Sequence, residues 1–252
     1  MSLEFRIAKT EEEKNLAYKI RYKVFCEELR YLDEHLLLNK LEKDEFDDLE
    51  TTIHFIALKD SIPIATVRLL TPNNEMTKKQ GYFGLSIEKY FDLSFYKGNN
   101  IKVAEISRSS VIEKERGKMN ILHLWMLVAQ YSISKDIFYL PTCAGTETDC
   151  SEDVQILTRI AKEKRLFHPF IFTQAKENCT NKSPFRYRLY ENSSNFVLPK
   201  TLELYVRMGA RFTGNPLFHT DFKMYTIPMV WDLNNIGSPF KYFLKRKNSE
   251  KI

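Results

Sequence analysis

The order in which strand-like and helix-like segments follow one another limits most strongly how this chain can fold. A short alternating strand comes first, and Thr10 with Glu13 then forms the capping pattern that opens a helix. Two β-rich runs flank residues 59–61, which is typical of a hairpin. Further strands and helices are expected at residues 101–112, 120–134, 137–140, 151–165, 200–208, 210–212 and 224–231. Such alternation predicts an α/β (α+β) fold, in which a central mixed, twisted sheet carries helices on both faces.

Domain organisation follows from length and from the absence of a linker-like segment. The 252 residues fit one large domain. No stretch is rich enough in glycine, proline or serine to divide the chain. We therefore predict a single domain over residues 1–240, with an insertion at about 141–199, where the pattern is less regular. Residues 241–252 form a basic C-terminal tail.

Charge and hydrophobicity exclude several classes of protein. The net charge is only +5, and the basic residues are interspersed with acids, which argues against nucleic-acid binding. The first residues are charged and do not resemble a secretory signal. No run approaches the roughly 20 apolar residues that cross a bilayer, so no stable membrane insertion is expected. These features predict a cytoplasmic protein.

The four cysteines do not suggest a disulfide framework or a metal site. Cys26, Cys143, Cys150 and Cys179 show no CxxC spacing and are expected to be reduced thiols. Cys143, Cys150 and His168 have an unusual separation for zinc ligands. We predict no bound metal.

An acid-rich, poorly periodic segment over residues 27–50 follows the first helix and is a candidate functional loop. Asp44 and Asp47 lie three residues apart in it, a spacing at which two carboxylates can converge on a cation or hold an arginine. The alternative is an ordinary solvated acidic loop.

Arg68 lies inside an otherwise apolar strand, in the run TVRLL. A buried arginine must be paired, because an unpaired buried charge costs several kcal/mol or more. Asp44 or Asp47 would be natural partners. The alternative is an edge-strand arginine whose charged end reaches water.

The segment VAEISRSSV, residues 103–111, is unusually polar for a central strand. In a straight strand Glu105 and Arg108 would point to opposite faces. A bulge between them would bring both to one side, and bulges gather at active sites. A carboxylate in a partly apolar cleft has a raised pKa and is suited to act as a general base. The alternative is a structural ion pair within the sheet.

Taken in order, these motifs resemble a known family. The order of the motifs is similar to that in the acyl-homoserine-lactone (autoinducer) synthases. These motifs are RYxVFxxE, a DxxD loop, TVRLL, and ExSR followed by a basic turn. They are more similar to the N-acyl amino acid synthases, and both belong to the GNAT superfamily. The ending PLFHTDFKMYTIPMVWDL is also similar to that of N-acyl amino acid synthases. The resemblance covers about the first 135 residues and resumes at residues 198–233.

The resemblance implies a set of site residues. By motif order, the substrate-binding positions are Arg21, Phe25, Tyr31, Asp44, Asp47, Arg68 and Phe83. The resemblance implies that Glu105 and Arg108 are catalytic. Tyr205, four residues before a glycine, is a candidate acid that protonates the departing thiolate. The alternative is that Tyr205 is an ordinary buried tyrosine of the core. Tyr31 stands where autoinducer synthases usually carry tryptophan, and the gap between Phe83 and Glu105 is longer here.

The family's activity implies a thioester donor. The resemblance implies a GNAT fold whose central strand splays from its neighbour, so that Glu105 faces a cleft that admits a pantetheine arm. No cofactor is bound, and an acyl-phosphopantetheine thioester is the co-substrate. The positions implied to meet it are Ser107, Ser109, Val111, Lys114, Arg116 and Lys118.

The turn after the central strand bears on the donor's identity. It is charged and has one glycine, unlike the glycine-rich turn that holds the CoA pyrophosphate in many relatives. Its cations are suited to meet the phosphopantetheine phosphate or the acidic face of an acyl carrier protein, and the alternative is an ordinary solvated turn. We therefore predict an N-acyltransferase that moves a long-chain acyl group from an acyl carrier protein or acyl-CoA to an amino acid or related amine. The alternatives are an autoinducer synthase, a non-catalytic acyl-carrier or lipid-binding module, and an acetyl-CoA-dependent acetyltransferase.

Overall fold

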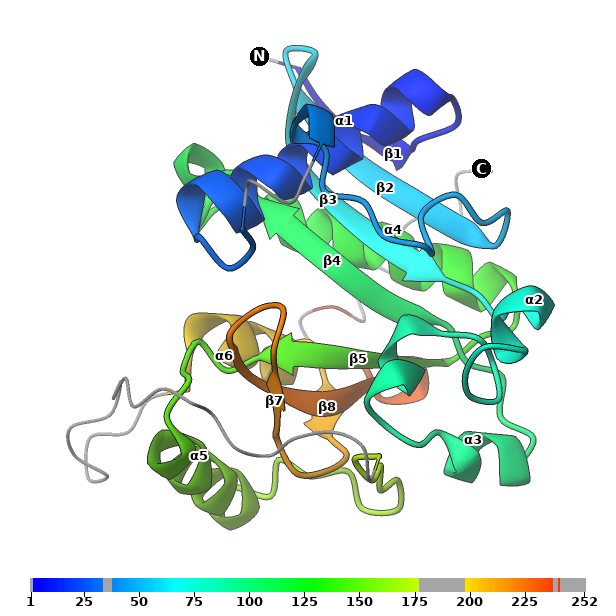
Figure 1. The fold of residues 1–252 in the computed structure, drawn as a ribbon, viewed down its shortest axis with the longest axis vertical. Helices are drawn as coiled ribbons and strands as arrows, with labels where there is room; N and C mark the ends of the chain where they lie inside the picture. The colour runs from blue at the N-terminus through cyan, green and yellow to red at the C-terminus, as the bar shows by residue number, and fades with distance from the viewer. Residues whose placement is uncertain (1, 34–37, 177–197, 238–239, 241–252) are drawn as a thin grey trace.

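The computed structural model describes residues 2–33, 38–176, 198–237 and 240, and its strands form two sheets (Figure 1). The first sheet has the order β1-β2-β3-β4, and every neighbouring pair is antiparallel. In the second, β8 pairs with β5, β6 and β7, again antiparallel. The strands are β1 (Leu3–Ile7), β2 (Thr52–Lys59), β3 (Ile62–Leu70), β4 (Glu105–Val111), β5 (Tyr139–Gly145), β6 (Ala210–Phe212), β7 (Leu217–His219) and β8 (Met224–Asp232).

The helices lie between and beside these strands. They are α1 (Glu11–Tyr22), α2 (Asn74–Thr77), α3 (Ser94–Gly98), α4 (Asn120–Ser134), α5 (Ser151–Glu163) and α6 (Lys200–Arg207). A π-helix, Lys23–Glu28, continues α1, and a 3-10 helix, Ser86–Lys89, precedes α3. Thr10 and Glu13 make the reciprocal capping bonds that the sequence predicted for α1. None of the helices in the described ranges is long and apolar enough to cross a membrane.

The two sheets meet at a single point and then part. Val103 forms a parallel bridge with Tyr139, and the Ala104 N–H donates to the Tyr139 carbonyl at 3.3 Å. From Glu105 onward, the described backbone has no hydrogen bond between β4 and β5. Figure 1 shows the two strands diverging from this point. The expected mixed α/β fold with a splayed central strand is confirmed, although the strands divide into two antiparallel sheets.

Helices cover both faces of the first sheet. Ile56 of β2 packs with Ala17 of α1, whereas its neighbour Phe55 packs in the cluster that contains Trp125 of α4. Because successive strand residues point to opposite faces, α1 and α4 lie on opposite sides of the sheet. The cluster around α4 also contains Met229 of β8, so the two sheets share one apolar core.

The segment expected to be an insertion is only partly described. Its first residues continue β5 as far as Gly145, and α5 follows. Residues 177–197 and the basic tail 241–252 lie outside the described residues, and the domain boundaries stay a prediction.

Candidate active site

The pairing of β3 with β4 contains a bulge. Arg68 lies opposite Ser107 and Thr66 lies opposite Ser110, so β4 has one more residue than β3 between these pairs. Arg108 is in that stretch and has a positive φ of 52°, which costs energy for a residue other than glycine. The structure therefore contains the bulge that the sequence predicted, and Arg108 is at its centre.

Six charged side chains from four parts of the chain form what we call the ionic cluster. Its members are Arg21, Glu42, Asp44, Asp47, Arg68 and Arg108. Three guanidinium groups meet three carboxylates, so the cluster carries no net charge. The pairing predicted for Arg68 is confirmed, and the alternative of a solvated arginine on an edge strand is excluded.

Asp47 lies at the centre of the ionic cluster. Arg21 donates to its two carboxylate oxygens at 2.7 and 2.9 Å, the two-point geometry that makes such pairs strong. Arg68 Nη1 bridges Asp47 at 3.0 Å and Asp44 at 2.6 Å. Arg108 Nη2 reaches Asp44 at 2.9 Å. The acidic loop is therefore fixed against β3, β4 and the end of α1.

Glu42 closes the ionic cluster, and sequence reasoning missed it. Its carboxylate accepts from Arg21 Nε and, at 3.1 Å, from Arg108 Nε. The residue is only 3% exposed. It lies in the aperiodic acidic segment, where no spacing distinguishes it from its exposed neighbours. The one signal was that three arginines need a third carboxylate beside Asp44 and Asp47 to balance their charge.

The electrostatics of the ionic cluster favour its ionised form. Burial alone would raise the pKa of Asp47, but Arg21 and Arg68 outweigh it and hold that pKa far below its usual range. The pKa of Asp44 is also lowered, because Arg68 and Arg108 outweigh burial. Among the described residues Arg68 Nη2 has no hydrogen-bond partner, so one buried donor stays unused.

Glu105 lies beside the ionic cluster, at the residue where β4 leaves β5. It is 3% exposed, and its carboxylate accepts hydrogen bonds from the Ser86 hydroxyl and, at 2.9 Å, from the Ile87 N–H. Burial raises its pKa, which Ser86, Arg68 and Arg108 only partly offset. A raised pKa suits a carboxylate that must accept a proton near neutral pH.

The surroundings of Glu105 differ from the sequence-based expectation. We expected an open cleft, but the carboxylate is enclosed under Ser86 and Ile87, because a buried carboxylate needs donors and this segment supplies two. Neither donor could be predicted, since nothing in the sequence pairs residues 86 and 87 with β4.

The predicted aromatic positions separate into two groups. Phe25 is buried and meets Phe222 edge-on, with ring centroids 5.5 Å apart. Tyr31 packs in the same small cluster, and burial raises its pKa. Phe83 instead packs against a different apolar cluster, and Glu88 binds its backbone N–H. The structure therefore brings Phe25 and Tyr31 together but not Phe83.

Tyr205 of α6 is packed in the apolar core that the two sheets share. Its ring stacks on Trp125 at 4.6 Å, and the Trp125 indole N–H donates to the Ser109 hydroxyl at 2.9 Å. Burial raises the pKa of Tyr205, and hydrogen bonding with Ser109 of β4 and Thr142 of β5 acts in the opposite direction. Tyr205 therefore lies near both of the strands that diverge.

The charged turn after β4 is paired with other residues rather than free. Arg116 is bonded to Glu28, and Lys118 meets Glu115 at 2.9 Å. The pKa of Glu115 falls to about 2 through its bonds with Lys118 and Lys59. Lys114 is exposed and has no carboxylate partner among the described residues. Val111 packs partly buried against the main core.

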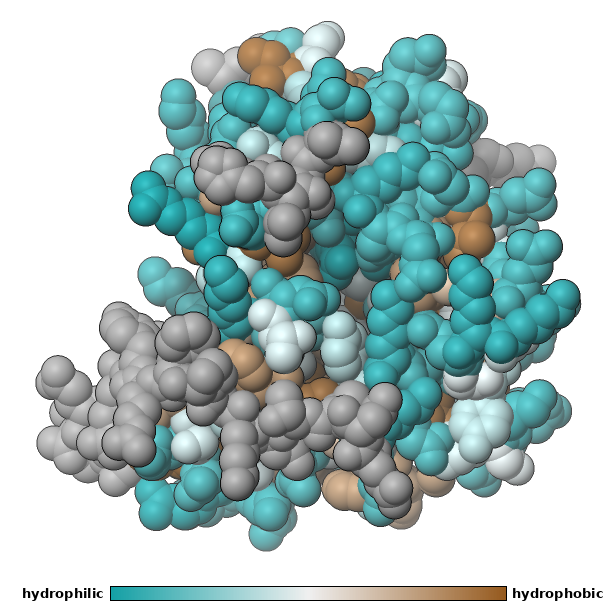
Figure 2. All heavy atoms as spheres, viewed as in Figure 1, coloured by the Kyte–Doolittle hydropathy of each residue, from teal (hydrophilic) through white to brown (hydrophobic). Residues whose placement is uncertain are grey.

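A surface groove lies elsewhere on the molecule. About 520 Å³ in volume, it runs beside α5 and is lined by residues such as Val154, Arg159 and Tyr225, and by none of the predicted site residues. Figure 2 shows that the visible face is mainly hydrophilic, with hydrophobic side chains showing only in small areas. The groove does not expose the carboxylates described above.

Comparisons with known proteins agree with this architecture. The family described as acetyltransferase (GNAT) domain matches residues 20–126. A curated relative, the L-ornithine N(alpha)-acyltransferase of Rhodobacter capsulatus, is 31% identical over 259 residues, covering 98% of this chain and 96% of that protein.

Two solved structures share the fold. FeeM, an N-acyl amino acid synthase from uncultured soil microbes, superposes with a TM-score of 0.57 at 11% identity, covering 92% of each chain. The AHL synthase LasI gives a TM-score of 0.51 at 14% identity, covering 92% of this chain and 91% of that one.

Proposed function

The chain belongs to the GNAT family of acyltransferases, and from this premise we propose that it transfers a long-chain acyl group from a phosphopantetheine thioester to the amine of an amino acid. The family membership makes the chain an acyltransferase. What we propose is the length of the acyl group, the acceptor and the donor. The observation that carries it is the position of Glu105: a buried carboxylate with a raised pKa, beside the ionic cluster and at the start of the gap between β4 and β5.

The acceptor we propose is an amino acid with a second amine, such as ornithine. The support is the relative whose name gives that activity, which aligns over nearly the whole chain. Arg108 is close enough to Glu105 to stabilise its charged form. Its guanidinium can therefore bind the carboxylate of an acceptor whose amine is at Glu105. A homoserine lactone product is the alternative within the family, and Tyr31 in place of tryptophan disfavours it.

The chemistry assigned to these residues is simple to balance. The neutral amine attacks the thioester carbonyl, a C–N bond forms, the C–S bond breaks, and the amine's proton passes to Glu105. A carboxylate has about four acceptor positions and Ser86 and Ile87 occupy two, so Glu105 keeps capacity for the amine or a relaying water. A backbone N–H of the bulged strand stabilises the oxyanion.

Tyr205 is the proposed acid that protonates the departing thiolate. Its place beside Ser109 of β4 and Thr142 of β5, where the two strands part, supports this role. We expect Tyr205→Phe to lower kcat about tenfold or more without changing the KM of the amine, as measured by steady-state kinetics. The matched control is Tyr96→Phe, because the buried Tyr96 hydroxyl has no hydrogen-bond partner among the described residues. If both variants keep full kcat, Tyr205 is only a core residue.

For the donor we favour an acyl carrier protein over CoA. The turn after β4 lacks the glycine-rich sequence that holds pyrophosphate, and its exposed Lys114 is available to an acidic carrier. The pairing of Arg116 and Lys118 with carboxylates leaves fewer free cations than the sequence suggested. We place the reaction in the cytoplasm, whose reducing conditions keep thiols from forming disulfides.

A product assay tests the proposal. The purified chain is incubated with a long-chain acyl carrier protein, the matching acyl-CoA or acetyl-CoA, together with a pool of amino acids, and products are identified by mass spectrometry. We expect a long-chain N-acyl amino acid, formed faster from the carrier protein. A lactone would indicate an autoinducer synthase, acetylated products an acetyltransferase, and no product from any donor a binding module.

A further inference from the structure

The β7–β8 hairpin extends from the second sheet to the first. Phe222, in the turn between the two strands, meets Phe25 edge-on, and the guanidinium of Arg108 lies over the Phe222 ring, 5.1 Å from its centroid. Figure 1 shows this hairpin (orange) rising from the lower strands toward β4 and the end of α1. The hairpin therefore carries side chains of the second sheet to the catalytic side of β4.

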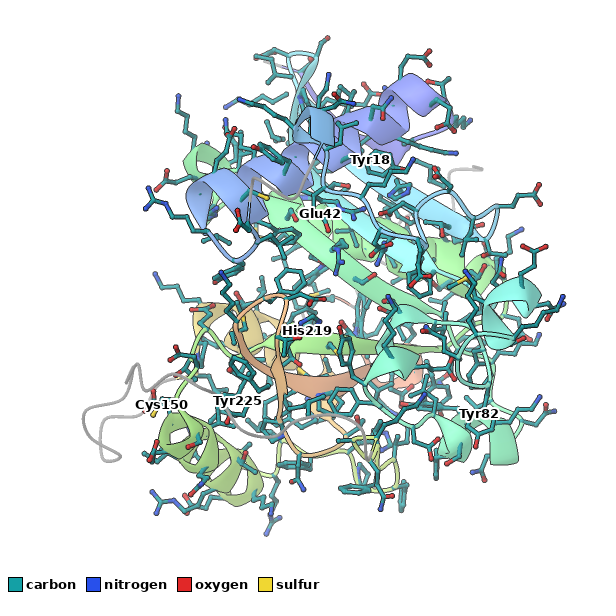
Figure 3. All side chains as sticks on the ribbon, in the orientation of Figure 1. Tyr18, Glu42, Tyr82, Cys150, His219 and Tyr225 are labelled. Atoms are coloured by element: carbon teal, nitrogen blue, oxygen red, sulfur yellow. The ribbon has the colours of Figure 1, made fainter. Side chains whose placement is uncertain are left out.

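His219, the last residue of β7, is packed between two aromatic rings at the base of this turn. Its ring lies 4.5 Å from the Tyr90 ring and 5.0 Å from the Phe222 ring, measured between centroids. It is 7% exposed. Figure 3 shows His219 between Glu42, in the upper part of the molecule, and Tyr225 below. Neither the sequence patterns nor the proposed mechanism gave this residue a role.

The hydrogen bonds of His219 define which ring nitrogen is free. The Phe222 N–H donates to Nδ1 at 3.4 Å, so the neutral ring carries its hydrogen on Nε2. None of the described residues accepts a hydrogen bond from Nε2. Nε2 is not among the fully buried atoms that lack a partner, so it is open to solvent and available to a ligand.

Charged side chains of both signs act on the His219 ring. Burial lowers its pKa to about 4, with Arg108 and Lys89 acting in the same direction and Asp221 against them. The ring is therefore neutral near pH 7, with two cations, Arg108 and Lys89, and one carboxylate, Asp221, near it. Arg108 uses Nε on Glu42 and Nη2 on Asp44, and Nη1 has no acceptor among the described residues. Two unused N–H donors thus come from neighbouring side chains.

We propose that Nε2 of His219 and Nη1 of Arg108 together bind the carboxylate of the acceptor amino acid. This inference rests on the proposed function and adds the group that selects the acceptor. In an α-amino acid the amine and the carboxylate share one carbon, so a carboxylate held at Arg108 brings the amine to the neighbouring Glu105. The site therefore accepts amino acids and rejects amines that lack a carboxylate.

His219→Phe tests the assignment, because phenylalanine keeps the ring between Tyr90 and Phe222 but removes the donor. Each protein is assayed with the amino acid that the wild type acylates best and with the same molecule as its α-carboxamide. We expect the ratio of the two kcat/KM values to fall at least about tenfold in the variant, through a higher KM for the amino acid. The KM of the acyl donor should not change.

The control variant is His168→Phe. His168 Nδ1 also accepts backbone N–H bonds, from Phe170 and Ile171, but it lies outside the site. It should keep the wild-type preference for the carboxylate. His219→Gln, which retains an amide donor, should fall between the wild type and His219→Phe.

The outcomes separate this inference from the proposed function. If the wild type acylates no amino acid, the proposed function fails. If it does, and His219→Phe keeps the carboxylate preference or loses activity equally on both acceptors, the assignment of His219 is wrong. Should His219→Phe not fold, the Nε2–H signal of wild-type His219 is followed by NMR. It is expected to move on addition of the amino acid and not of the carboxamide, and an unmoved signal would overturn the assignment.

Discussion

Replacing Glu105 by glutamine is expected to lower the rate of acyl transfer at least about tenfold while the protein stays folded. Glutamine has nearly the same shape, and its amide oxygen can accept from the Ile87 N–H while its NH₂ group donates to the Ser86 oxygen. It cannot take a proton from the attacking amine. Single-turnover measurements of acyl transfer give the rate, and circular dichroism checks the fold.

The pH dependence of the wild type provides a second sign of the same role. Burial raises the pKa of Glu105, so kcat/KM should fall as the pH drops through that raised value, where the base becomes protonated. This acidic limb should disappear in Glu105→Gln. Glu88→Gln is the matched control, because Glu88 is another buried carboxylate and binds the backbone N–H groups of Tyr82 and Leu85. Glu88→Gln should unfold more easily, but its kcat/KM should still fall at acidic pH. An unchanged rate in Glu105→Gln would remove Glu105 from the mechanism.

Asp47→Asn is expected to destabilise the fold by about 3–5 kcal/mol at pH 7, the usual cost of removing one partner from a buried ion pair. Asp47 receives both Nη groups of Arg21 and one of Arg68, and all three side chains are at most 1% exposed. Without the carboxylate, two buried guanidinium groups lose their shared counter-charge. Urea unfolding followed by tryptophan fluorescence measures the change.

The adjacent residue supplies the control for Asp47. Asp48 pairs with Lys43 at 2.6 Å, but its side chain is 68% exposed, so solvent screens the interaction. Asp48→Asn should change the free energy of unfolding by no more than about 0.5 kcal/mol. Equal losses in the two variants would mean that the ionic cluster does not hold the acidic loop in place.

The parts of the site that could be predicted are those where a local pattern forces a physical consequence. An arginine within an apolar strand requires a carboxylate, and Arg68 has two. A polar central strand with glutamate and arginine an odd number of residues apart requires a bulge to bring them together, and Arg108 lies in one. The helix that Thr10 caps, α1, followed from its capping pattern.

The parts that could not be predicted depend on contacts between distant segments. Glu42 looks like any surface acid until Arg21 and Arg108 close around it. Ser86 covers Glu105 from a short 3-10 helix, and nothing in the sequence places that helix beside β4. The division into two sheets depends on the residue at which β4 and β5 cease to pair. No spacing in the sequence predicts which residue that is.

The central claim is that the amine and the thioester meet where β4 parts from β5, and a crystal structure with both ligands tests it most directly. The chain would be crystallised with the amino acid acceptor and a thioether analogue of the acyl-phosphopantetheine donor. We expect the analogue to enter between β4 and β5, with the acceptor's amine within about 2.6–3.2 Å of a Glu105 oxygen or joined to it by one water. An analogue bound in the groove beside α5, with Glu105 remote from both ligands, would contradict the account.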